Sequence, residues 1–285
     1  MGLLILLLVV IIPILNSFSI NWKYRSKYIQ RSLSTSEVDE VDDNILLRLN
    51  SPEVYQFNLH GYDFAAYFKD YKLDDKMLQD NASLNEKLIQ LIGIENGWGN
   101  GLHPTTQLCL NSLHSVVKPG DSVLDYGCGS GILSIWASKC GASKCSGIEV
   151  CEDSINAAKK NVLLNKCDNI NIHHTKDVYI GNVDFQLYDV AVANILPGVL
   201  SRLAAPLIGL LKPHGFMILS GMRRSDLKAI REIYSPFILE NSDEVSSSSH
   251  EVFGEWISLT FQTKNLTKIE LQNHFQTLLD SNIGY

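Results

Sequence analysis

The sequence lacks the basic charge and the paired cysteines that mark two large classes of protein. Its 285 residues carry a formal net charge of -7, whereas a nucleic-acid-binding protein usually carries a basic face for phosphate contacts. Six cysteines are present, but none forms a C-x-x-C pair or stands beside a histidine at zinc-ligand spacing. We therefore expect no direct contact with nucleic acid, no metal site and no disulfide framework.

The sequence also lacks an apolar run long enough to span a bilayer comfortably. Residues 3–15 are almost wholly apolar, but they fall short of the roughly 20 residues that a membrane helix needs. Residues 16–36 contain no acid, and their Lys and Arg alternate with serines and aromatics. We expect residues 1–36 to target the chain to a plastid, with a mitochondrial presequence or an uncleaved membrane anchor through residues 3–15 as alternatives. No stable membrane span is expected in the mature protein.

The acidic charge and the spacing of apolar residues define the regions on either side of the central part of the chain. Five acids in the seven positions of 37–43 indicate a solvated linker, so residues 37–96 are interpreted as an acidic linker and a small N-terminal region. Within it, residues 45–49 suit a strand, and apolar residues recur at helical spacing over 83–92. Residues 264–285 form a C-terminal tail in which Ile269, Phe275, Leu278 and Leu279 predict the apolar face of one helix.

Residues 97–263 alternate apolar strands with helices, which is typical of a parallel sheet covered on both faces. The expected strands are 122–125, 145–149, 170–174, 188–194, 216–220 and 256–262. The expected helices are 106–117, 133–140, 154–165, 199–211 and 225–234, with 212–215 closing the fourth of them and an exposed loop at 246–249. The pattern predicts an α/β fold with a doubly wound, mostly parallel, Rossmann-like sheet of the seven-stranded type, of which these ranges place six strands.

A glycine-rich loop, D-Y-G-C-G-S-G at 125–131, follows one expected strand and opens a helix. Its three alternate glycines let the backbone turn sharply and let a ligand approach. The spacing differs from the G-x-G-x-x-G dinucleotide fingerprint, and no Lys or Arg lies nearby to meet a pyrophosphate. S-adenosylmethionine (SAM) carries no phosphate, so this loop suits SAM; the alternative is an ordinary strand-to-helix turn.

Glu149 ends the next strand, 22 residues after Gly127. An acid at about this distance is placed to accept hydrogen bonds from both ribose hydroxyls of a nucleoside cofactor. The alternative is a solvated residue at the end of a strand.

Three segments in order carry a resemblance: G-N-G-L-H-P-T-T at 99–106, the loop continued to 133, and A-N-I-L at 193–196. Over residues 97–262 the chain resembles the PrmA family, which methylates a ribosomal protein in bacteria. The resemblance implies the class I SAM-dependent methyltransferase fold, SAM as the cofactor and a protein substrate as partner. In that family Asp usually stands in place of Glu149, and a folded recognition domain precedes the methyltransferase.

The loop and the resemblance together predict the residues that bind the cofactor. They are Thr106, Asp125, Gly127, Cys128, Gly129, Gly131, Glu149 and Asn194. His103 is interpreted either as a residue that closes over the cofactor or as one that fixes the turn before Pro104. Thr106 also suits the cap of the helix that is expected to begin there.

Asn194 ends the strand at 188–194, at the edge where doubly wound folds bind their ligands. A lysine acceptor must first lose a proton, which costs about 4.6 kcal/mol at pH 7. We predict as catalytic residues Asn194, Ile195 and Leu196, the first through its side chain and the others through backbone carbonyls that orient the acceptor nitrogen. The alternative for Asn194 is a cap of the turn before Pro197.

The predicted function is SAM-dependent protein-lysine N-methylation of a ribosomal or other organellar protein. One alternative is a methyltransferase for another protein, such as an electron-transfer flavoprotein subunit, or for a small molecule. Another is a catalytically silent assembly factor, which the intact loop, Glu149 and Asn194 disfavour. A nicotinamide-dependent oxidoreductase is disfavoured by the loop spacing.

Overall fold

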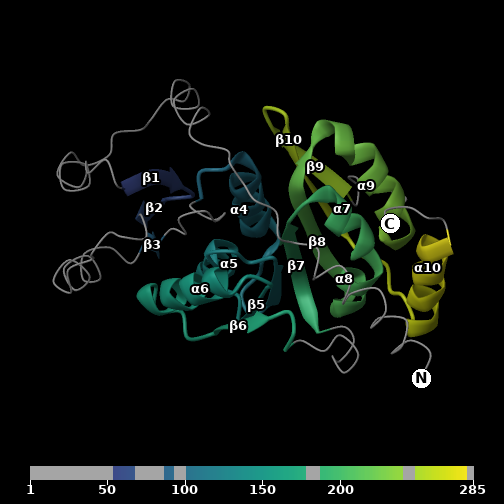
Figure 1. Ribbon diagram of the computed structural model, residues 1–285, viewed down its shortest axis with the longest axis horizontal. Helices are drawn as coiled ribbons and strands as arrows, with labels where there is room; N and C mark the ends of the chain where they lie inside the picture. The colour runs from purple at the N-terminus through teal and green to yellow at the C-terminus, as the bar shows by residue number, and fades with distance from the viewer. Residues whose placement is uncertain (1–53, 68–86, 93–100, 178–186, 240–247, 281–285) are drawn as a thin grey trace.

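The computed structural model describes residues 54–67, 87–92, 101–177, 187–239 and 248–280. Its centre is a seven-stranded sheet in the order β6-β5-β4-β7-β8-β10-β9 (Figure 1). The strands are β4 (Ser122–Tyr126), β5 (Lys144–Glu149), β6 (Ile170–His174), β7 (Tyr188–Asn194), β8 (Leu211–Arg223), β9 (Ser248–Phe253) and β10 (Trp256–Gln262). Five strands run parallel, and β10 runs antiparallel to both of its neighbours. The predicted doubly wound fold is confirmed.

Helices cover both faces of this sheet (Figure 1). One face carries α4 (Pro104–Val116), α5 (Ile132–Lys139) and α6 (Glu152–Leu164). The other carries α7 (Pro197–Arg202), α8 (Ala204–Leu210), α9 (Leu227–Tyr234), α10 (Lys268–Asp280) and the short turn η2 (Ser235–Phe237). Within β7, Val192 packs toward the first group and Ala193 toward the second. Burial on both faces explains why β7 is an almost continuous apolar run.

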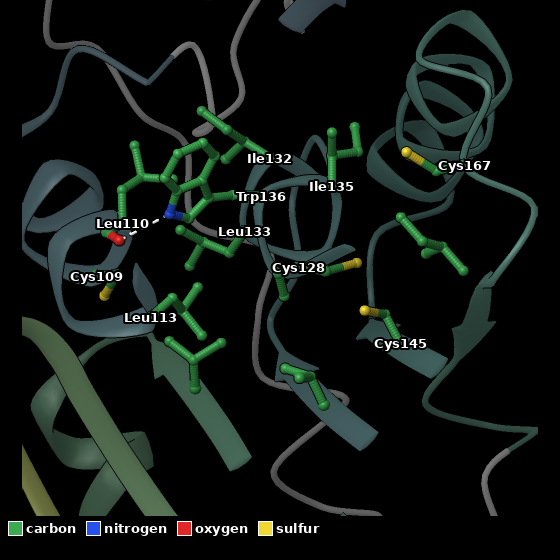
Figure 2. Packing of buried hydrophobic residues seen from close by; sticks show 14 of the residues in the cluster. Cys109, Leu110, Leu113, Cys128, Ile132, Leu133, Ile135, Trp136, Cys145 and Cys167 are labelled. Carbon is green, nitrogen blue, oxygen red and sulfur yellow. Dashed lines mark hydrogen bonds between the residues drawn. The ribbon is translucent and has the colours of Figure 1, made fainter. Parts of the chain in front are cut away.

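Trp136 is the largest fully buried side chain of the first face. Its indole nitrogen donates a hydrogen bond of 2.8 Å to the carbonyl of Leu110, which joins α5 to α4 (Figure 2). A tryptophan is well buried only when its N–H finds a partner. The α4 helix is therefore held to α5, the helix that begins where the glycine-rich loop ends.

A separate three-stranded sheet, β1 (Val54–Leu59), β2 (Tyr62–Tyr67) and β3 (Leu88–Ile92), packs against the same helices. The β1 and β2 strands form a hairpin whose two turn residues, His60 and Gly61, have φ of +51° and +75°. Such left-handed pairs match the twist of a hairpin. The helix predicted over 83–92 is wrong for its described part, because Leu88–Ile92 pairs with β2 as a buried parallel strand.

Three expectations in the second half of the chain also need correction. The helix predicted at 199–211 is two helices, α7 and α8, with Leu203 between them. Residues 212–215 do not close a helix but belong to β8, where the pairing with β7 shifts register between Tyr188 and Val190. The loop predicted at 246–249 is wrong for its described part, because Ser248 and Ser249 begin β9 and pair with β10.

The C-terminal tail forms α10, as predicted. Of the residues predicted for its apolar face, Ile269 is 68% exposed, whereas its neighbour Leu271 is buried in the core. The side chains of Phe275, Leu278 and Leu279 lie outside the described part of the helix. The strand expected at 45–49 and the start of the helix expected at 83 lie outside the described residues. Of the helices that the structure describes, none combines the length and the apolar character needed to cross a membrane.

Candidate active site

The glycine-rich loop connects the end of β4 to the start of α5. Gly127, Gly129 and Gly131 have φ of +79°, +54° and +81°, a region that residues with a side chain rarely adopt. The backbone nitrogens of Gly127 and Cys128 both donate to the carbonyl of Ile148, at 2.8 and 3.1 Å. The loop is thereby tied to the end of β5, with its backbone free of side chains at alternate positions.

Glu149 lies at the end of β5, directly against this loop. One carboxylate oxygen accepts from the backbone nitrogen of Gly129 at 3.0 Å, and the other accepts from Val150 and Cys151 at 2.8 and 3.0 Å. A carboxylate offers about four lone-pair positions, so these three bonds leave one on the oxygen that faces Gly129. Glu149 is therefore held rigidly, and the one acceptor position that it retains is fewer than the two that bonds from both ribose hydroxyls would need.

Asp125 and Cys128 contribute to the loop from within the core. One oxygen of the Asp125 carboxylate accepts from the backbone nitrogen and the hydroxyl of Ser134, at 3.0 and 2.7 Å. This fixes the start of α5. The sulfur of Cys128 packs against Gly147 of β5 and lies in the buried cluster of Figure 2. Any cofactor contact by Cys128 thus falls to its backbone.

Burial raises the pKa of Asp125 to about 7, and the charge of Glu149 adds to the rise, while the hydrogen bonds from Ser134 oppose it. Because the folded-state pKa lies above the unfolded value, the protonated form stabilises the fold at low pH, and that stability is lost as the pH rises toward 7. We expect the unfolding free energy of the wild type, relative to Asp125→Asn, to fall by up to about 1.4 kcal/mol per pH unit between about pH 4 and pH 7. Urea unfolding of both proteins across this range measures it; a pH-independent difference would contradict the assignment.

Asn194 and Thr106, 88 positions apart in the chain, meet at the loop end of the sheet. The side-chain nitrogen of Asn194 donates to the hydroxyl of Thr106 at 3.4 Å. Thr106 is buried in the first turn of α4, and Asn194 ends β7. With its nitrogen turned to Thr106, Asn194 has its amide oxygen left to accept from a substrate.

Ile195 links Asn194 to the glycine-rich loop. Its backbone nitrogen donates to the carbonyl of Ser220 at 3.2 Å, and its side chain lies over Gly127 so closely that a Cβ there would overlap it. Its backbone also lies against Gly221 of β8: a Cβ on Gly221 would come within 2.9 Å of the Ile195 nitrogen and 2.8 Å of its carbonyl carbon. Two glycines therefore fix the position of the segment that follows β7.

The structure narrows the role predicted for Leu196. Its carbonyl accepts from the backbone nitrogens of Val199 and Leu200, at 2.9 and 3.0 Å, as the first acceptor of α7. A carbonyl has two lone pairs, and both are used here. The orienting role predicted for residues 194–196 accordingly rests on the Asn194 side chain and the Ile195 backbone. The Leu196 side chain is 47% exposed.

His103 is the N-cap of α4, so the structure supports its interpretation as a turn-fixing residue. Its ring nitrogen Nδ1 accepts from the backbone nitrogen of Thr105 at 3.3 Å and pairs with the Thr105 hydroxyl at 2.7 Å. The cap role suggested for Thr106 is wrong, because the helix begins two residues earlier, at Pro104. The His103 ring also meets Trp256 edge-on, with centroids 4.6 Å apart, and burial lowers the pKa of His103.

Two hydrogen-bond acceptors of this site, on Asp125 and Glu149, match the donor groups that SAM carries. The buried oxygen Oδ1 of Asp125 has no hydrogen-bond partner among the described residues, and Glu149 retains one acceptor position. SAM carries an ammonium and ribose hydroxyls, all of them donors, and no phosphate that would need a basic loop. Thr106, Glu149 and the loop glycines are the residues that would hold it.

Comparison with known proteins decides the family. The profile described as ribosomal protein L11 methyltransferase (PrmA) matches residues 77–264. The chain belongs to this family. The PrmA match confirms the resemblance seen over 97–262 and extends it toward the N-terminus. A SAM-dependent methyltransferase family implies SAM as the cofactor.

Individual proteins of the PrmA family are similar to this chain in sequence and in structure. The chain is 38% identical over 141 residues to ribosomal protein L11 methyltransferase of Burkholderia thailandensis, covering 50% of this chain and 45% of the relative. It is 33% identical over 209 residues to the protein of that name from Thermoanaerobacter sp. (strain X514), covering 71% and 64%. The solved structure of ribosomal protein L11 methylase from Lactobacillus delbrueckii subsp. bulgaricus aligns with a TM-score of 0.57 and 27% identity, over 74% of this chain and 99% of that chain. The chain thus spans about half the length of the Burkholderia relative.

Sequence reasoning missed two glycines that shape the site. Gly221 leaves room for the backbone of Ile195, and Gly147 leaves room for the sulfur of Cys128, which would lie 3.0 Å from a Cβ there. Each stands inside a strand, and an isolated glycine in a strand often marks a close approach of another group. That signal was available, but it does not say which segment approaches.

Proposed function

We propose that the chain is a SAM-dependent methyltransferase that methylates lysine nitrogen in ribosomal protein L11. Its membership of the PrmA family supports the activity, and its relatives are named for this substrate. The observation that carries the proposal is the meeting of Asn194 with Thr106 beside a glycine loop that Glu149 binds.

The protein's own residues bind and position the two reactants. SAM, when bound, would supply the methyl group of its sulfonium to a deprotonated amine, with S-adenosylhomocysteine as the leaving group. Glu149 and the loop glycines hold the nucleoside, while the amide oxygen of Asn194 accepts from the acceptor nitrogen and aims its lone pair. Most of the rate then comes from holding the reactants in a reactive geometry. Burial lowers the pKa of His103, so this N-cap of α4 adds no positive charge at neutral pH.

The test is a methylation assay with a defined substrate. The purified chain is incubated with isotopically labelled SAM and, in parallel, with recombinant L11 or with an organellar lysate, and the products are analysed by intact mass and peptide mapping. We expect label on lysine of L11. Label on another protein of an organellar lysate, such as an electron-transfer flavoprotein subunit, or only on metabolites, would reject the substrate. Binding of SAM without transfer to any of these would favour a silent assembly factor.

For localisation, we propose that residues 1–36 direct the chain to an organelle. The apolar run at 3–15 followed by an acid-free, Arg- and Lys-containing segment supports a signal-plus-transit address of the plastid type. A fusion of residues 1–40 to a fluorescent protein is expected to colocalise with the plastid. Mitochondrial or membrane fluorescence would select one of the two alternatives, and a diffuse cytosolic signal would reject organelle import.

A further inference from the structure

The outer edge of β3 is completed by side chains of α6 and of the residue that caps its C-terminus. On its other edge β3 pairs with β2. The backbone nitrogen and carbonyl of Gln90 bond to the amide of Asn165, at 2.9 and 2.6 Å. Those of Ile92 bond to the amide of Asn161, at 2.7 and 3.3 Å. Because alternate residues of a strand turn their backbone groups to the same edge, two asparagines one helical turn apart substitute for a neighbouring strand.

Asn161 differs from Asn165 in one respect. Its side-chain nitrogen also donates to the carbonyl of Ser130, at 2.9 Å, inside the glycine-rich loop. The nitrogen of an amide carries two hydrogens, and here one goes to Ile92 and one to Ser130. Asn161 is completely buried, so water cannot replace either bond. The described bonds of the Asn165 side chain go to Gln90 and to the backbone of its own helix.

The bond to Ser130 acts on the peptide that leads from the loop into α5. The Ser130 carbonyl belongs to the peptide that leads into Gly131, the left-handed N-cap of α5. Ala158, three residues before Asn161 on α6, lies under the same glycine, 3.3 Å from the place a Cβ would take. One face of α6 therefore supports the loop from below at two adjacent points, one by packing and one by a hydrogen bond.

We propose that Asn161 is a positioning residue for cofactor binding, which fixes the Ser130–Gly131 peptide and ties it to β3 of the N-terminal sheet. This rests on the proposed function, since the loop is taken to hold SAM. Asn161 does not touch the cofactor. Its effect is to hold the loop in the conformation that binds, so that the cofactor does not have to supply the ordering free energy itself.

The test compares the same substitution at the two asparagines. Asn161→Asp keeps the acceptor for the Ile92 nitrogen but loses the donors to the Ile92 and Ser130 carbonyls. Asn165→Asp keeps the acceptor for the Gln90 nitrogen and loses the donors to the Gln90 and Asn161 carbonyls, so it is matched in chemistry but does not touch the loop. Affinity for S-adenosylhomocysteine is measured by calorimetry at pH 8 and the melting temperature by circular dichroism. We expect the Kd to rise about tenfold for Asn161→Asp and less than threefold for Asn165→Asp, even where both melting temperatures fall alike.

A pH profile separates positioning from general destabilisation. At lower pH the carboxyl introduced by Asn161→Asp takes up a proton and regains a donor for Ser130, so the Kd of this variant should recover toward the wild-type value. If Asn161→Asp does not fold, Asn161→Thr and Asn165→Thr give the same comparison. Equal loss of affinity at both sites, or none at Asn161, would overturn the positioning role. A wild-type chain that fails to bind S-adenosylhomocysteine would overturn the proposed function and this role with it.

Discussion

Gly221→Ala is expected to lower turnover by about 100-fold or more, because misplacing a positioning group by about 1 Å has that effect. The new Cβ would stand within 2.9 Å of three backbone atoms of Ile195, which cannot rotate away as a flexible side chain would. The segment that carries Asn194 must then move away from β8. Steady-state methylation kinetics with a protein substrate measure the loss.

The control for Gly221→Ala is Gly120→Ala. Gly120 has a similar left-handed φ, +96° against +85° for Gly221, but nothing lies within 4 Å of a Cβ there. Both substitutions carry the backbone strain of a left-handed alanine, about 1–2 kcal/mol, and only one carries the clash. Gly120→Ala should therefore lose stability with unchanged turnover. Equal turnover in the two variants would show that the Ile195 contact does not position the site.

Asn194→Ala is expected to lower kcat by about 100-fold while raising the Kd for S-adenosylhomocysteine less than threefold. The reason is that the amide oxygen acts on the acceptor nitrogen, whereas Glu149 and the loop hold most of the cofactor. Single-turnover kinetics and calorimetry give the two quantities separately. Asn171→Ala, at an exposed position of β6, is the matched control and should leave both unchanged.

The outcome for Asn194→Ala separates two roles for this residue. An unchanged kcat would reject orientation of the acceptor and leave Asn194 as a cap of the turn before Pro197. A large rise in Kd with a small fall in kcat would instead make it chiefly a cofactor ligand.

The parts of the fold that sequence reasoning placed well are those whose burial is reflected along the chain itself. The bounds of β6, β7 and β10 match the expected strands, because each is an apolar or alternating run between clear breaks. The glycine-rich loop and Glu149 were found for a related reason. Their chemistry is local, set by spacing within one strand-loop-helix unit.

The parts that failed depend on partners distant in sequence. Residues 88–92 carry apolar residues at helical spacing, yet they form β3 because β2 and the two asparagines at 161 and 165 complete its hydrogen bonds. The serine-rich start of β9 has weak strand propensity and is fixed by pairing with β10. Gly221 and Asn161 matter through contacts with Ile195 and Ser130, which no pattern within their own elements reveals.

The central claim, that the loop and Glu149 form a SAM site, is tested most directly by calorimetry of the purified chain with SAM and with NAD. SAM should bind at one site per chain and NAD should not bind, because the loop lacks the pyrophosphate fingerprint and basic residues. Glu149→Ala should weaken SAM binding by more than tenfold, since it removes both the ribose acceptor and the bond to Gly129. Binding of NAD in preference to SAM, or SAM affinity unchanged by Glu149→Ala, would contradict the account.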